Sequence, residues 1–226
     1  MGIRPLNRDS RIDSNMFVLE FRDSNDILSE KQGEGDLNID YARRAQLFFE
    51  ENYGTVGDGY NEFDRAAELG DCAQFPYGFI NPAGGAISPC VFLKFNKIWG
   101  WEPTPVTEED FAENPEWPAE FKSHWDAQAD KEKIWIHCQG RNPADKEALA
   151  DGGMTYLPAT QGFPATFFPY TGNKEGYQSP LVAVNFNLDE KYIGQLIHIE
   201  CRAYYKGVRH ETKSKTGLVQ FEVLMK

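Results

Sequence analysis

Apolar and polar residues alternate along much of the later part of the chain. The segments 196–204 and 217–225 place an apolar side chain at every second position, which predicts antiparallel strands with one buried face. Apolar runs at 91–98, 134–138 and 181–187 predict three more strands, and Pro and Gly fill the connections between strands. The pattern indicates a set of short strands without the strand–helix rhythm of a parallel sheet.

Helical spacing is clearest in two segments. Between residues 37 and 52 five apolar side chains recur at helical intervals: Leu37, Tyr41, Ala45, Phe48 and Phe49. Trp117, Phe121 and Trp125 recur every four residues after a Pro-rich connector, so we expect a second helix that runs to about residue 131. A short apolar run at 16–21 predicts one early strand. These elements predict a mostly β fold, an immunoglobulin-like antiparallel β-sandwich with one or two flanking helices.

Composition narrows the possible partners. The chain has 226 residues and a formal net charge of −12, which disfavours binding to nucleic acid. Hydrophobic residues make up 41% of the sequence, enough to build a core. No window approaches the roughly 20 apolar residues that cross a bilayer, and the first residues lack the apolar region of a signal peptide. As written, the sequence predicts a soluble domain.

A search for catalytic and metal-binding motifs finds little. The four histidines show no HExxH spacing, and neither a P-loop nor a GxSxG elbow occurs. His137 and Cys138 are neighbours on a predicted strand, so their side chains point to opposite faces and do not form a catalytic pair. The acidic stretch 58–64 lacks Gly at the sixth position, and no Glu stands at the twelfth, where an EF-hand calcium loop requires them. We therefore predict a protein without enzymatic activity, metal or cofactor.

The four cysteines allow alternative pairings, and buried free thiols are the other possibility. Cys72 and Cys90 flank a loop rich in Pro, Gly and aromatic residues, which a disulfide would restrain. Cys138 and Cys201 both lie in predicted strands, and Cys201 points inward. We therefore expect a Cys72–Cys90 bridge and a Cys138–Cys201 bridge, the second joining the two sheets of the sandwich.

Four stretches carry a family resemblance. They begin with an aromatic-Gly-aromatic triplet, Pro-Cys and a strand that ends Leu-Lys-Phe-Asn-Lys-Ile-Trp-Gly-Trp-Glu-Pro, and they continue in order to the last strand. The stretches are 77–103, 135–145, 156–184 and 199–223. Together they resemble the extracellular domain of the β subunit of the sodium/potassium-transporting pump, most closely its invertebrate forms, and proton/potassium-pump β subunits share the pattern.

The resemblance implies a non-catalytic subunit whose ectodomain binds extracellular loops of the pump's catalytic α subunit. It implies that the subunit supports assembly, stability and trafficking of the α subunit and tunes its potassium affinity at the plasma membrane. Family members are anchored by one helix that precedes the ectodomain, so contact with the membrane is expected only through such a helix. A further family disulfide lies upstream of Cys72, but residues 1–71 contain no cysteine.

The same resemblance suggests how the chain is organised. Residues 1–71 would form a juxtamembrane segment or flap with the helix near 37–52, poorly matched to the family. Residues 72–226 would form the ectodomain proper. Two alternatives to the pump role are an adhesion module of the same fold, with homotypic contacts between copies, and an unrelated secreted hydrolase.

Aromatic, Pro-braced loops are suited to partner binding because little ordering is lost on contact. We predict two sets of α-subunit contacts on this basis: Tyr77, Gly78 and Phe79 first, then Phe168, Pro169, Tyr170 and Tyr177. The alternative is that these aromatic rings cap the core of the sandwich and that the glycine serves backbone geometry only.

Overall fold

A computed structural model of the chain describes residues 1–6, 16–19, 37–81, 83, 86–172, 175–211 and 216–225. The predicted early strand at 16–21 lies partly outside these residues.

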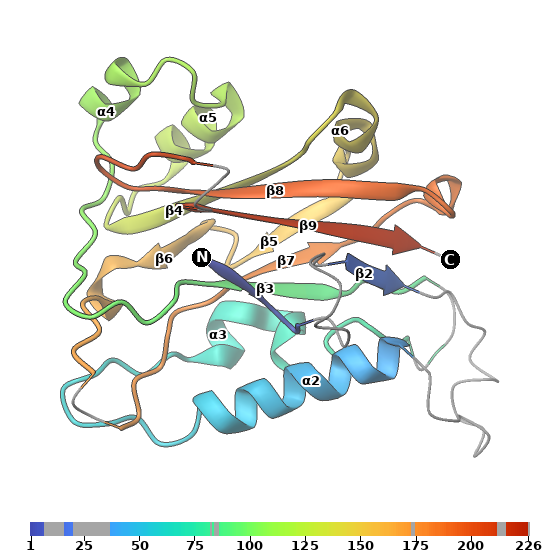
Figure 1. The fold of residues 1–226 in the computed structure, drawn as a ribbon, viewed down its shortest axis with the longest axis horizontal. Coiled ribbons are helices and arrows are strands. Elements are labelled where there is room, and N and C mark those ends of the chain that lie inside the picture. Colours follow the sequence, from blue (N-terminus) through green and yellow to red (C-terminus); the bar gives the residue numbers. More distant parts are fainter. Residues whose placement is uncertain are drawn as a thin grey trace.

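The first sheet has four antiparallel strands in the order β1-β3-β7-β5 (Figure 1). They span Gly2–Arg4 (β1), Cys90–Lys94 (β3), Val182–Phe186 (β7) and Met154–Leu157 (β5). β3 ends at Lys94, four residues before the predicted end, because β7 pairs with it only as far as Leu93. The residues that follow β3 run along one end of the molecule.

The second sheet has five strands in the order β2-β9-β8-β4-β6. They span Met16–Leu19 (β2), Leu218–Met225 (β9), Leu196–Tyr204 (β8), Lys133–Gly140 (β4) and Gly162–Pro164 (β6). β2 runs parallel to β9, and the other neighbours are antiparallel. β8 and β9 occupy almost the whole of their predicted ranges because every second side chain is buried.

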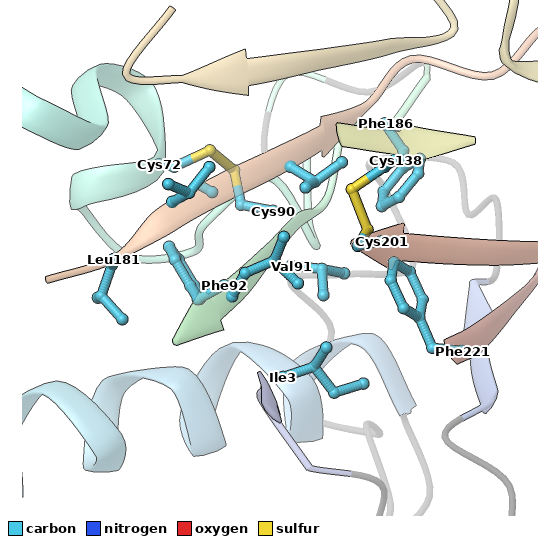
Figure 2. Packing of buried hydrophobic residues seen from close by; sticks show 14 of the residues in the cluster. Ile3, Cys72, Cys90, Val91, Phe92, Cys138, Leu181, Phe186, Cys201 and Phe221 are labelled. Atoms are coloured by element: carbon cyan, nitrogen blue, oxygen red, sulfur yellow. A yellow bond between two sulfur atoms is a disulfide. The ribbon is translucent and has the colours of Figure 1, made fainter. Parts of the chain in front are cut away.

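The core lies between the two sheets, as Figure 2 shows. Phe186 of β7 meets Phe221 of β9 with 6.0 Å between ring centroids. The inward side chains of β8, among them Ile199 and Cys201, are fully buried. The prediction of a mostly β sandwich with flanking helices is confirmed.

Helix α2 (Leu37–Asn52) covers the outer side of the first sheet (Figure 1). It spans the predicted helix, and Tyr41, Ala45, Phe48 and Phe49 are buried as the spacing predicts. The Phe49 ring lies 5.0 Å from that of Phe92 in β3, nearly perpendicular to it. The apolar stripe of α2 therefore closes the first sheet from outside.

Helices α4 (Glu108–Glu113) and α5 (Ala119–Ala127) cover the outer face of the second sheet. Phe121 of α5 stacks on Tyr204 of β8 with ring centroids 4.1 Å apart. α5 ends about four residues earlier than predicted because the backbone of Gln128 is extended. A second aromatic cluster thus forms outside the main core.

Shorter helical segments fill the connections. They are α3 (Arg65–Leu69), η1 (Gly70–Ala73), α6 (Pro143–Leu149), η2 (Ala165–Phe167) and η3 (Glu190–Tyr192). In the described part of the chain, none of the helices combines the length and apolar character that a membrane crossing requires.

Candidate partner-binding surface

A disulfide joins Cys72 in η1 to Cys90 at the start of β3 (Figure 2). The intervening loop folds back on the strand, because the Cys90 nitrogen donates to the Tyr77 carbonyl at 3.0 Å. The Ser88 nitrogen donates to the Gly78 carbonyl at 3.1 Å. The bridge and these bonds fix the aromatic-Gly-aromatic triplet beside β3, so the pairing favoured by the sequence is present.

Tyr77 and Phe79 of this triplet face inward. Their side chains are 3% and 0% exposed, beneath α2. Tyr77 lies 5.4 Å from Phe49, and Phe79 lies 5.5 Å from Tyr41, centroid to centroid. These rings hold α2 on the sheet, and their predicted contact with a partner stays a prediction.

Gly78 serves backbone geometry. Its φ is +73°, a region that L side chains rarely adopt. A Cβ at this position would lie 1.7 Å from the Ser88 carbonyl oxygen, well inside van der Waals contact. The loop therefore requires glycine here.

The second predicted set lies at the end of the sandwich that follows β3. Phe168 packs against Trp101, with 5.3 Å between centroids, and Tyr177 is buried. Pro169 and Tyr170 are half-buried. Within this set, Phe168, Pro169 and Tyr170 therefore keep part of their surface open to solvent, whereas Tyr177 does not.

The most exposed aromatic ring at this end was missed by the sequence analysis. Trp99 is 63% exposed, and Ile98, the last residue of the segment expected to be strand, is 49% exposed. Trp99 pairs with Tyr170 in an isolated parallel bridge, and the Gly100 nitrogen donates to the Tyr170 carbonyl at 2.9 Å. A large exposed aromatic ring on a fixed backbone is typical of interface anchors.

The Trp99 ring packs in a defined position against the neighbouring segment. A Cβ added to Gly172 would lie 2.4 Å from the indole, so the ring rests directly on the glycine backbone. We call Lys97, Ile98, Trp99, Tyr170 and Gly172 the tryptophan surface. The sequence signal that would have found it is the run of large side chains directly after a strand that ends at Lys94.

The second disulfide joins Cys138 to Cys201, the predicted pair. The expectation that it joins the two sheets is wrong. Cys138 of β4 and Cys201 of β8 are directly opposed on neighbouring strands of the second sheet. Their Cα atoms are 3.9 Å apart.

His137 and Cys138, the pair weighed from the sequence, do not face one another in the structure. His137 points away from Cys138 toward Phe121 of α5, with 6.5 Å between rings. Burial lowers the pKa of His137 to about 4, so the ring is neutral at neutral pH. Among the described residues, no three His, Cys, Asp or Glu side chains gather as metal ligands.

The geometry defines a disulfide-bridged, immunoglobulin-like β-sandwich with an exposed aromatic surface at one end. The sodium/potassium ATPase beta chain family model matches residues 27–221, and this chain belongs to that family.

Curated relatives agree with this assignment. Sodium/potassium-transporting ATPase subunit beta-2 of Drosophila melanogaster is 41% identical over 145 residues, which are 61% of this chain. Subunit beta-1 of the same organism is 36% identical over 141 residues, also 61% of the chain. Probable subunit beta-3 of Caenorhabditis briggsae is 31% identical over 159 residues, 70% of the chain. In each case the match spans 42% of the relative's own length.

Proposed function

We propose that this chain is the extracellular part of a non-catalytic pump subunit. It binds extracellular loops of the catalytic α subunit at the plasma membrane, supports assembly, stability and trafficking of that subunit, and tunes its affinity for potassium. The observation that carries the proposal is the family match over residues 27–221.

The tryptophan surface is the part of the molecule best suited to the α-subunit contact. Trp99 offers a large exposed ring on a backbone that is already fixed by Tyr170, so binding orders few groups. Of the residues predicted from sequence, Tyr170 belongs to this surface and Pro169 is its neighbour in the chain, whereas Tyr177 is buried and Tyr77 and Phe79 pack beneath α2. Truncation of a central interface anchor to alanine costs about 2 kcal/mol or more of binding free energy.

The test joins this chain to the tail and membrane helix of a native β subunit and expresses the fusion with an α subunit. We expect the fusion to restore surface expression of the α subunit and to co-purify with it. Trp99→Ala should weaken both readouts. The control is Ile193→Ala, which removes an apolar side chain that is 48% exposed, against 63% for Trp99, from the connection between β7 and β8 at the other end of the sandwich (Figure 1).

Failure of the unmodified fusion to bind or export the α subunit would refute the proposed function. If beads coated with the domain then aggregate with one another, the adhesion role replaces it. Equal effects of Trp99→Ala and Ile193→Ala would refute the tryptophan surface as the contact site while leaving the function in place.

A further inference from the structure

A cavity of about 540 Å³ lies at the C-terminal end of α2, next to the tryptophan surface. Its walls come from the last turn of α2, the turn that follows it, the residue Lys97 and the segment that carries Tyr170 and Tyr177. Its side chains are mostly aromatic or charged: Glu50, Glu51, Lys97, Tyr170, Glu175 and Tyr177.

The walls are fixed by direct backbone contact between two loops. The Gly57 nitrogen donates to the Gly176 carbonyl at 3.1 Å. A Cβ on Gly57 would lie 1.9 Å from the Glu175 carbonyl oxygen, and a Cβ on Gly176 would lie 2.4 Å from the Gly57 nitrogen. Only glycines permit this approach, so the cavity is formed before any ligand arrives.

Two tyrosine rings in the cavity already hold a cation. The rings of Tyr170 and Tyr177 are 5.0 Å apart, centroid to centroid. The Lys97 ammonium lies 5.7 Å from the first centroid and 5.9 Å from the second, within the range of a cation–π interaction. Among the described residues no carboxylate forms a salt bridge with Lys97, and the tyrosine faces are its direct contacts in the cavity.

The end of α2 also attracts positive charge. A helix C-terminus carries a partial negative charge, and basic side chains usually stand in the last turn. α2 has none there. It has Glu50 and Glu51 instead, and Glu175 adds a third carboxylate from the facing loop. Departures from local preferences, such as this one for basic side chains at a helix C-terminus, occur mainly at functional sites.

We propose that this cavity receives the ammonium or guanidinium group of a lysine or arginine side chain from a partner polypeptide. Lys97 covers the tyrosine faces while the partner is absent and gives way when the partner binds. The inference rests on the proposed function, which makes the partner the catalytic subunit. Lys97 and Tyr170 belong to both the cavity and the tryptophan surface, so one docking event covers both.

Direct binding is tested with Nα-acetylarginine methyl ester as the probe, in which the guanidinium is the one charged group, titrated into the purified chain carrying ¹³C-labelled tyrosine. We expect saturable shifts in the ring signals of Tyr170 and Tyr177. Nα-acetylcitrulline methyl ester, which has nearly the same shape without the guanidinium charge, should leave them unchanged. Equal binding of the two esters, or no binding of the arginine ester, would overturn the proposal.

Two sets of substitutions should change the affinity for the arginine ester in opposite directions. Glu50→Gln/Glu51→Gln/Glu175→Gln should weaken arginine ester binding at least about fivefold, since attraction at the site is lost. Lys97→Gln should strengthen it at least about threefold, since a competing cation is removed. The control Glu113→Gln/Glu132→Gln changes exposed carboxylates elsewhere, including the last residue of α4, and should leave binding unchanged. Weaker binding to Lys97→Gln, or wild-type binding to the triple variant, contradicts the proposal.

The pump assay separates this proposal from the proposed function. If the unmodified fusion exports the α subunit and the triple variant does so equally well, the cavity is not the receptor site and the function stands. If the fusion fails while the arginine ester binds as described, the function falls and the cation site stands. Urea unfolding checks that the triple variant is folded, and we expect no loss of stability because unfavourable charge leaves the end of α2.

Discussion

The phenolic oxygen of Tyr156 in β5 lies 2.7 Å from the backbone nitrogen of Cys138 in β4 and accepts its hydrogen bond. The same hydroxyl lies 3.4 Å from the Cys138 carbonyl, to which it donates. These backbone groups point away from β8, on the side where β6 pairs only with Lys133–Trp135. One side chain of the first sheet thus takes the place of a missing strand in the second, beside the disulfide.

Removal of the Tyr156 hydroxyl tests how much its hydrogen bond to Cys138 stabilises the fold. Tyr156→Phe keeps the ring but leaves the Cys138 N–H without its acceptor in a buried place. We expect the free energy of unfolding to fall by about 1–3 kcal/mol, the usual cost of an unpaired buried backbone group. Urea denaturation at neutral pH measures the change.

The matched control for this hydroxyl is Tyr205→Phe. Tyr205 is half-buried and packs edge-on against Trp101, and its hydroxyl has no hydrogen-bond partner among the described residues. We expect a change within about 0.5 kcal/mol. Equal losses in the two variants would show that the Tyr156 hydroxyl contributes nothing through Cys138.

The sequence predicts which face of a strand a side chain lies on better than it predicts which strand lies beside it. Strict alternation placed Cys201 on the buried face of β8, and the structure agrees. Whether Cys138 sits opposite it in the same sheet or across the core depends on strand order, which long-range contacts decide. The error about the second disulfide follows from this, because two inward cysteines on strands fit both arrangements.

Burial of loop aromatics is hard to predict for a similar reason. Tyr77 and Phe79 look like a contact motif, and they become core because α2 folds over them from a distant part of the sequence. Trp99 is exposed because β3 ends early.

Helix α6 was not predicted, although Asn142 and Asp145 form a capping box around its start. That signal is local and was available in the sequence.

The two disulfides are expected to contribute unequally. Cys138 and Cys201 are 63 residues apart in sequence, and Cys72 and Cys90 are 18 apart. Loop-closure entropy therefore predicts a loss of about 4 kcal/mol for Cys138→Ala/Cys201→Ala and about 3 kcal/mol for Cys72→Ala/Cys90→Ala. Urea denaturation of each double variant without reductant measures these losses. A larger loss for the shorter loop would contradict the chain-entropy account.

Comparison of substitutions at Gly78 and Gly100 separates two costs of adding a side chain, backbone strain and steric clash. Gly78 and Gly100 both have positive φ, at +73° and +63°. A Cβ on Gly78 meets the Ser88 carbonyl oxygen, and a Cβ on Gly100 meets nothing within 4 Å. We expect Gly100→Ala to cost about 1–2 kcal/mol from backbone strain alone, and Gly78→Ala to cost clearly more. Thermal unfolding compares the two, and equal losses would show that the Ser88 contact is relieved without cost.

His137 makes stability depend on pH in a defined window. Its folded pKa is about 4, and its unfolded pKa is near 6.5. The unfolded chain therefore binds more protons between these values, and stability falls as pH drops from 6.5 to 4. Above pH 6.5 the ring is neutral in both states and adds no pH dependence. We expect a loss of about 1–3 kcal/mol across the window from this one group.

The variant His137→Phe isolates the effect of this ring, because it keeps an aromatic side chain beside Phe121 and removes the titrating nitrogens. Carboxylates also destabilise the fold in acid, but they do so equally in both proteins. The difference in unfolding free energy between pH 7 and pH 4 should therefore be smaller in the variant. NMR titration of the wild-type imidazole should give a midpoint near 4. A midpoint near 6.5, or identical pH dependence of the two proteins, would mean that His137 is solvated and that α5 does not seal this part of the second sheet.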